Sequence, residues 1–338
     1  TARQTLAEQL PDALRPLARL AFNFWWTWQP DGEALWRAVD PEAWSACERN
    51  PVRLLRELPR RTLLAAASDA AVLERMASLA ARLDAHLARP PSAVSRAGPD
   101  APIAFLCSEY AIDASLPIYS GGLGVLAGDL LKEASDRARP LVAVGLLYRR
   151  GYFHQRLDPS GWQHEYWTVA TPEQLPVERV VGPAGARVTV EVPIRSHRVR
   201  AAVWRAGIGR VPLYLLDTDL PENDPVDRFI SAQLYVGDRE YRLMQYALLG
   251  IGAVRALAAL GIRPATWHLN EGHPALVALE LAREGMARGE APGRALAAAR
   301  DRVVFTTHTP VAAGNESYLP AEVEGVLGAW ARALRAAA

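Results

Sequence analysis

From Pro102 onward, short apolar runs alternate with segments of helical spacing, and this alternation restricts the possible folds more than any other feature. The apolar runs are residues 103–107, 141–148, 266–269 and 303–307, and the helical segments lie near 123–137, 239–260 and 273–287. Continuous apolar runs of this length are typical of parallel strands buried on both faces, and the segments between them are typical of covering helices. The sequence therefore predicts an α/β domain over residues 100–338.

Two stretches depart from this alternation. Residues 1–90 show apolar residues at spacings of three and four, which predicts a separate helical N-terminal region, and a Pro-, Ser- and Gly-rich linker at 89–102 follows it. Residues 188–217 alternate as antiparallel strands do, which predicts a β-hairpin insertion at about 185–217.

An aromatic cluster, FNFWWTWQ at 22–29 with Trp36 and Trp44, lies inside the helical region. Indole rings can stack on pyranose faces and line a sugar site, but large aromatics more often fill the space between helices. We interpret the cluster as core.

Composition excludes several classes of protein. The chain has 338 residues, is 50% hydrophobic and 22% charged, and carries a formal net charge of +1. This balance describes a folded soluble protein and gives no electrostatic reason to expect nucleic acid or an anionic membrane as a partner. No apolar run approaches the roughly 18 residues of a membrane span. Cys47 and Cys107 are the only cysteines. Two cysteines are too few for a disulfide scaffold and lack the spacing of zinc ligands, which favours a reducing cytoplasm as the location.

The segment PIYSGGLG, residues 117–124, places three glycines directly before a helical pattern. Exposed backbone N–H groups and the helix dipole make such a place suitable for an anion, most plausibly a phosphate. A tight turn without a ligand is the alternative. No GK[ST] follows, and the GxGxxG fingerprint is missing, so the P-loop and the dinucleotide site are excluded.

Polar residues follow each predicted parallel strand, at the edge where open α/β sheets bind ligands. The first strand leads to Ser108, Glu109 and Tyr110, and the later ones to YRRGYFHQ (148–155), HLNEGHP (268–274) and TTHTP (306–310). HLNEGHP contains metal-ligand residue types, but its spacing does not match HExxH, so no metal site is predicted. His308 could also be a hydrogen-bonding residue without a ligand.

These strand ends carry a family resemblance. SEYAIDASLPIYSGGLGVLAGDLLKEASD, LVAVGLLYRRGYFHQRLDPSGWQHEYW, LLGIGAVRALAALGIRPATWHLNEGHPALVALE and VVFTTHTPVAAGNESY resemble the N-terminal half of an α-glucan (glycogen or maltodextrin) phosphorylase of the short bacterial and archaeal type. The match runs from about residue 20 to about residue 318. It implies a B-type glycosyltransferase fold, in which two Rossmann-like domains face each other across a cleft and this chain holds the first.

The resemblance implies roles for individual residues. The loop of Gly121, Gly122, Leu123 and Gly124 would face the substrate phosphate and the sugar. His308 and Glu271 are the candidate catalytic residues: His308 resembles the histidine that hydrogen-bonds the glucosyl 6-hydroxyl, and Glu271 stands where many phosphorylases have aspartate. The remaining two candidates, Asn270 and His273, would shape this loop.

The implied reaction transfers the terminal glucosyl residue of an α-1,4-glucan to phosphate, giving glucose 1-phosphate in carbohydrate metabolism. Pyridoxal phosphate would be the cofactor, but its lysine and the cationic phosphate clamp lie in the family's C-terminal domain. The one lysine here, Lys132, is in the pattern of a solvated helix residue. We therefore expect an N-terminal fragment that lacks the cofactor domain and is inactive alone.

The expected partners are glucan, phosphate and the C-terminal half of the same enzyme, with a homo-oligomer possible. Two alternatives remain open. One is a non-catalytic glucan- or partner-binding protein derived from the same half. The other is a related B-type glycosyltransferase such as a starch synthase, although the KxGG loop of those enzymes is missing here.

Overall fold

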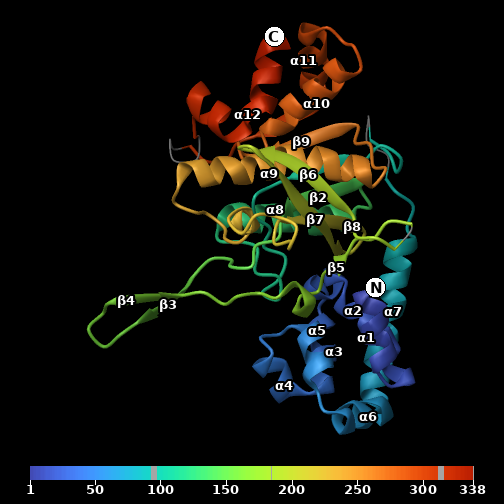
Figure 1. Cartoon of the computed structure of the whole chain (residues 1–338). Helices are drawn as coiled ribbons and strands as arrows, with labels where there is room; N and C mark the ends of the chain where they lie inside the picture. Colours follow the sequence, from blue (N-terminus) through green and yellow to red (C-terminus); the bar gives the residue numbers. More distant parts are fainter. Residues whose placement is uncertain (93–96, 184, 311–315, 338) are drawn as a thin grey trace.

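Figure 1 shows the computed structural model of the chain, which describes residues 1–92, 97–183, 185–310 and 316–337. Residues 93–96 of the predicted linker and residues 311–315 of the last motif lie outside the described part. A helical N-terminal region is followed by a largely parallel sheet with helices on it (Figure 1). The predicted α/β class is thus confirmed.

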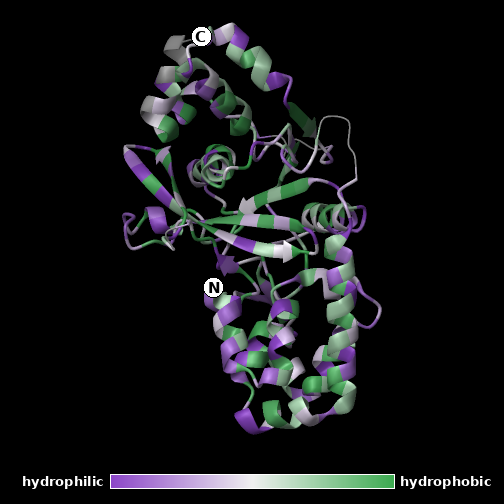
Figure 2. Cartoon of the chain, turned by 90° about the vertical axis from the view of Figure 1, so that its right-hand side faces the viewer, coloured by the Kyte–Doolittle hydropathy of each residue, from purple (hydrophilic) through white to green (hydrophobic). Residues whose placement is uncertain are grey.

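The main sheet has the strand order β10-β9-β1-β2-β8-β7-β5, with β6 paired to β7. The first five strands of this order are all parallel. Their bounds are Val303–Thr306 (β10), Thr266–Asn270 (β9), Ile103–Leu106 (β1), Leu141–Leu146 (β2) and Val211–Asp217 (β8). The four predicted apolar strands are therefore β1, β2, β9 and β10. The expected burial is wrong for β10, because it is an edge strand and its Val304 and Phe305 are exposed. Figure 2 shows that strands of the central layer are largely hydrophobic, as expected for strands covered on both faces.

The stretch expected to form a hairpin insertion is instead part of the main sheet. It forms Thr189–Ile194 (β6), His197–Ile208 (β7) and β8, which pair antiparallel in sequence, and the short Glu178–Arg179 (β5) pairs with β7. The predicted alternation is present, but β8 is apolar enough to lie beside β2 as a parallel strand. Leu213, Leu215 and Leu216 are fully buried there, so packing joins these strands to the core.

Seven helices make up the N-terminal region among the described residues: Ala2–Gln9 (α1), Arg15–Ala21 (α2), Gly32–Val39 (α3), Pro41–Ala46 (α4), Pro51–Glu57 (α5), Arg60–Ser68 (α6) and Ala70–Ala88 (α7). Side chains cap several of them. Asn50 accepts from the first amides of α5, and Asp69 does the same for α7. The aromatic cluster lies in their core, with Trp26 packed edge-on against Trp36 and Trp44. The interpretation of this cluster as core is confirmed.

The helices of the second region cover the sheet. Gly122–Asp136 (α8) contacts β7 and β8, and Arg239–Ala259 (α9) contacts β2, β6 and β8. In Figure 1 they lie on opposite sides of the sheet. Leu276–Ala287 (α10), Pro292–Arg300 (α11) and Pro320–Ala337 (α12) form a further layer beyond α9.

One antiparallel hairpin stands apart from the main sheet. His154–Leu157 (β3) pairs with Gln163–Tyr166 (β4), and the hairpin projects from the body in Figure 1. All eight of its strand residues are exposed. Within the described residues, no helix has both the length and the apolar character needed to cross a membrane.

Candidate active site

The parallel strands β1, β2, β9 and β10 bring the four predicted strand ends to one edge of the sheet. Hydrogen bonds connect them directly. Tyr148, after β2, donates its hydroxyl to the Ser108 carbonyl after β1 (2.9 Å), and the Ser108 hydroxyl lies 3.4 Å from Nδ1 of His273. The Asn270 amide, at the end of β9, donates to Sγ of Cys107 (3.3 Å). The structure thus brings the predicted polar segments together.

The glycine loop joins β1 to α8, and its first amides are already occupied. The Glu109 carboxylate accepts from the amides of Ser120 (2.6 Å) and Gly121 (3.0 Å) through Oε2. Gly121 is the N-cap of α8 and provides no side chain to cap it. The next three amides, those of Gly122, Leu123 and Gly124, have no intrahelical partner because they form the first turn of the helix. These three amides are the ones placed for an anion.

The loop glycines differ in the room around them. A Cβ at Gly122 would meet nothing within 4 Å, whereas one at Gly124 would lie 2.7 Å from Oε2 of Glu109 and 2.9 Å from Cβ of Tyr119. Gly124 is therefore needed for packing, and Gly122 opens onto free space.

Glu271 organises the turn after β10. Its carboxylate accepts from the backbone amides of His308 (2.5 Å) and Thr309 (3.1 Å) and from the hydroxyls of Thr307 (3.0 Å) and Thr309 (3.3 Å). The residue is buried and has a left-handed backbone, with φ of 63°. Burial raises the pKa of Glu271, but the hydrogen bonds from His308 and Thr307 outweigh it, so the pKa lies below its usual value.

We expect the 307–309 turn to lose this support in acid. A depressed folded-state pKa contributes stability that is present above the unfolded value, 4.5, and is lost as the pH falls through the folded value. Glu271→Ala should lower the free energy of unfolding at pH 7 by about 1–3 kcal/mol, because four donors lose their acceptor. Chemical denaturation at pH 7 and pH 3.5 measures both effects. An equal loss at both pH values would contradict the assignment.

His308 projects from this turn at the same edge. It is exposed, and its Nε2 lies 2.8 Å from Oδ1 of Asn270, which can only accept. Nε2 therefore carries the proton in the neutral ring, and Nδ1 remains as an acceptor for a ligand hydroxyl. Asn270 is buried and is itself anchored on Cys107. Asn270 and His308, both predicted separately as site residues, are in direct contact.

His273 borders a cavity of about 240 Å³ that also contacts Tyr235, Tyr246, Arg242 and Glu316. Its ring meets those of Tyr235 and Tyr246 at centroid distances of 6.3 and 5.3 Å. Burial lowers the pKa of His273, so the neutral ring is favoured at pH 7. Arg242 and Glu316, which both line this cavity, form an ion pair.

Comparison with known proteins adds to this geometry. Maltodextrin phosphorylase of Thermococcus litoralis is 42% identical over 327 residues, which cover 96% of this chain and 39% of that protein. Glycogen phosphorylase of Mycobacterium tuberculosis is 41% identical over 330 residues, 94% of this chain and 38% of that protein. The chain is homologous to the N-terminal part of glycogen and maltodextrin phosphorylases. The sequence resemblance is thereby confirmed.

Two further matches cover parts of the chain. Glycogen phosphorylase of Aquifex aeolicus is 36% identical over 302 residues, which are 89% of this chain and 43% of that protein. A family model described as "Protein of unknown function (DUF3417)" matches residues 10–116. The chain thus spans about two fifths of the length of these phosphorylases.

The phosphorylase resemblance implies pyridoxal phosphate as the cofactor, which would need a lysine to form a Schiff base. No lysine lies at this edge of the sheet among the described residues. Lys132 is the one lysine of the sequence, and it lies half-buried in α8, ten residues after Gly122. A rise of about 1.5 Å per residue places it roughly 15 Å along the helix from the loop. Lys132 therefore does not lie where a Schiff base at the glycine loop would form.

The metal-ligand types of HLNEGHP are used otherwise. His268 Nε2 lies 2.6 Å from the Thr306 hydroxyl, Glu271 holds the 307–309 turn, and His273 contacts Ser108. The described residues contain no group of three or more histidines, cysteines or carboxylates that could hold a metal ion.

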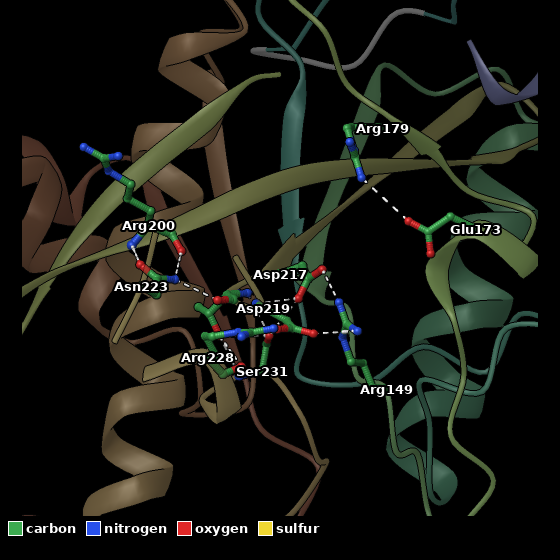
Figure 3. Close-up of polar contacts among 10 residues, drawn as sticks. Arg149, Glu173, Arg179, Arg200, Asp217, Asp219, Asn223, Arg228 and Ser231 are labelled. Atoms are coloured by element: carbon green, nitrogen blue, oxygen red, sulfur yellow. Dashed lines mark hydrogen bonds and ion pairs between the residues drawn. The ribbon is translucent and has the colours of Figure 1, made fainter. Parts of the chain in front are cut away.

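A polar network that the sequence did not reveal anchors the segment after β8 (Figure 3). Arg149, three residues after β2, lies between Asp217 (3.3 Å) and Asp219 (2.6 Å). Asp219 also binds Nε of Arg228 (2.6 Å), and Ser231 donates to Asp217 (3.3 Å). The network fixes the start of the segment that leads to Tyr235.

The backbone at the end of β2 extends this connection. The amides of Arg149 (3.1 Å) and Arg150 (2.8 Å) both donate to the Ala232 carbonyl, and the Leu234 amide donates to the Arg150 carbonyl (3.3 Å). The Ala170 amide, at the base of the β3–β4 hairpin, donates to the Arg149 carbonyl (2.7 Å). One strand end thus holds both the hairpin base and the segment before Tyr235.

Sequence reasoning singled out Glu109 only as a residue at a strand end and did not mention Tyr235. The Tyr235 hydroxyl donates to Oε1 of Glu109 (2.6 Å), although the two lie 126 positions apart. Tyr235 has a left-handed backbone, with φ of 55°. No local sequence pattern identifies such a residue, because its position depends on the network around Arg149 described above.

Proposed function

We propose that this chain forms one wall of an α-1,4-glucan phosphorylase site, in which the terminal glucosyl residue of the glucan is transferred to phosphate. The observation that carries the proposal is the placement, at one sheet edge, of three first-turn helix amides without an intrahelical partner and an exposed histidine whose Nδ1 has no bond to another described residue. Homology to glycogen and maltodextrin phosphorylases supports it.

The phosphate-binding part consists of the amides of Gly122, Leu123 and Gly124. They point out of the first turn of α8, where the helix dipole adds positive potential. The N-cap is glycine, so no side chain competes for these amides. An anion that gains negative charge during the reaction would be stabilised by such preorganised donors.

The sugar-binding part is His308. Nδ1 accepts the hydrogen bond of a glucosyl hydroxyl, by resemblance the 6-hydroxyl, while Asn270 fixes the ring by accepting from Nε2. Glu271 has its carboxylate oxygens engaged by the 307–309 turn, so we assign it to positioning His308. His273 and Asn270 shape the same edge from β9 and the turn after it.

The cationic clamp and the cofactor would come from the C-terminal half of the enzyme, as the resemblance implies. Two arginines near this edge already have carboxylate partners: Arg149 binds Asp217 and Asp219, and Arg242 binds Glu316. They are therefore not the residues we expect to hold phosphate. The two cysteines are free and buried, which suits a reducing cytoplasm.

The test joins this chain to the remaining length of the Thermococcus litoralis relative; we call the product the joined enzyme. With maltoheptaose, phosphate and pyridoxal phosphate, the joined enzyme should release glucose 1-phosphate, and the 338-residue chain alone should release none. Release by the chain alone at a comparable rate would contradict the proposal. Retention of maltodextrin by the joined enzyme without release would support the non-catalytic glucan-binding alternative instead.

A further inference from the structure

Glu109 is a buried carboxylate to which the function above gives no direct role. Its side chain is 2% exposed, and its two oxygens accept from three donors in two distant segments. Oε2 takes the amides of Ser120 and Gly121, and Oε1 takes the hydroxyl of Tyr235. Burial of a carboxylate destabilises the folded state unless its oxygens accept hydrogen bonds. The three hydrogen bonds to Glu109 therefore favour one defined loop conformation.

The carboxylate supports α8 without using the amides that an anion needs. A serine or aspartate at the N-cap would accept from the second or third amide of the helix, Leu123 or Gly124. Gly121 cannot do so, and Glu109 instead holds the two amides before the first turn. Among the described residues, none of the ion pairs includes Glu109, and its negative charge faces the positive end of the α8 dipole.

Tyr235 keeps the carboxylate oriented from the other side. Burial and the charge of Glu109 raise the pKa of Tyr235, so its hydroxyl remains a donor throughout the physiological range. The amide of the preceding residue, Leu234, donates to the carbonyl of Arg150, four residues after β2. Glu109 thereby connects the glycine loop, through Tyr235, to the segment that follows β2.

The space around Gly124 shows how closely the loop packs against the Glu109 carboxylate. A Cβ there would lie 2.7 Å from Oε2 of Glu109, which is too close for a non-bonded contact. The packing of α8 onto Glu109 therefore requires glycine at this position. At Gly122, by contrast, a Cβ would meet nothing within 4 Å.

We propose that Glu109 is the positioning residue of the glycine loop, and that by holding the Ser120 and Gly121 amides it aims those of Gly122, Leu123 and Gly124 at the phosphate. That the anion is phosphate depends on the proposed function. The hold of Glu109 on the loop, meaning its hydrogen bonds to the Ser120 and Gly121 amides, is independent of that function. It can be measured in this chain without catalysis.

Hydrogen–deuterium exchange of the peptide covering residues 118–124 tests the hold. Glu109→Ala should speed exchange of the Ser120 and Gly121 amides about tenfold or more, because both lose their acceptor. Glu109→Gln should retain most of the protection, since its amide oxygen can still accept both bonds. Gly124→Ala should resemble Glu109→Ala, because its methyl group displaces the carboxylate.

Asp113→Ala is the matched control. Asp113 also accepts a loop amide, that of Ser115 (3.0 Å), and the hydroxyl of the same residue (2.7 Å). Its loss should leave exchange of residues 118–124 unchanged. Circular dichroism confirms that each variant is folded, and Tyr235→Phe, which keeps the ring, provides a milder variant with a smaller increase. Equal exchange in Glu109→Ala and the parent would overturn the proposal.

Kinetics of the joined enzyme test the consequence for phosphate. Glu109→Ala should raise KM for phosphate or lower kcat by about 10- to 100-fold in total, with KM for maltoheptaose nearly unchanged, and Glu109→Gln should restore most of the loss. Faster exchange of the loop with unaltered phosphate kinetics would overturn the phosphate part and leave the hold intact. An inactive parent would count against the proposed function, while the exchange result would stand by itself.

Discussion

Gly122→Val is expected to lower the turnover of the joined enzyme by about 100-fold or more, the effect of losing one preorganised donor to a charge that develops in the reaction. The valine side chain would enter the open space in front of the first-turn amides, where the phosphate must approach. No atom lies within 4 Å of a Cβ added at this position, so the chain itself leaves room for the start of a side chain. Initial rates at varied phosphate concentration measure the loss.

Gly293→Val separates this effect from the general cost of a β-branched residue in a helix. Gly293 also lies in the first turn of a helix, α11, and is exposed with no atom within 4 Å of an added Cβ. This variant should keep the parental turnover and the parental KM for phosphate. If Gly122→Val behaves like Gly293→Val, the glycine loop is only a turn, which the sequence left as an alternative.

His308→Ala is expected to cost about 1–3 kcal/mol of transition-state binding, because a glucosyl hydroxyl loses its acceptor. That corresponds to roughly 5- to 150-fold in kcat/KM. The exposed ring makes few packing contacts, and Glu271 holds the turn through the backbone amide of His308, so the turn itself should persist. The thermal midpoint should therefore change little.

A substrate that lacks the hydroxyl identifies the partner of His308. A glucan whose terminal residue is 6-deoxy should be a poor substrate for the parent and almost equally poor for His308→Ala, since one half of the hydrogen bond is already missing. A penalty on the 6-deoxy substrate as large as on the normal one would show that the two groups are not coupled. The assignment of His308 to that hydroxyl would then be wrong, even with the homology intact.

Much of the fold follows from local patterns. The four apolar runs became β1, β2, β9 and β10, and the predicted helices near 123–137, 239–260 and 273–287 became α8, α9 and α10. A buried parallel strand must be apolar on both faces, and that requirement is visible in the sequence itself. Helices α11 and α12 and the exposed β3–β4 hairpin were not predicted, because a partly polar segment does not reveal which face it buries.

The candidate site was also predictable from the sequence only in part. Gly121, Gly122, Leu123 and Gly124 could be selected from sequence because a glycine run directly before a helical pattern leaves backbone amides open to an anion. That Gly121 is already bound to Glu109 could not be predicted, because the two residues meet only once the loop has folded back onto the end of β1.

The sequence by itself determined the four apolar parallel strands, helices α8, α9 and α10 and which chemical groups follow each of those strands, because periodicity and glycine content act within a few residues. Only the tertiary structure decided how those groups are used. The Glu271 carboxylate faces the 307–309 turn, and the Asn270 oxygen selects the tautomer of His308. Contacts of this kind join residues some 37 or 38 positions apart and depend on strand order and register, which no local pattern specifies.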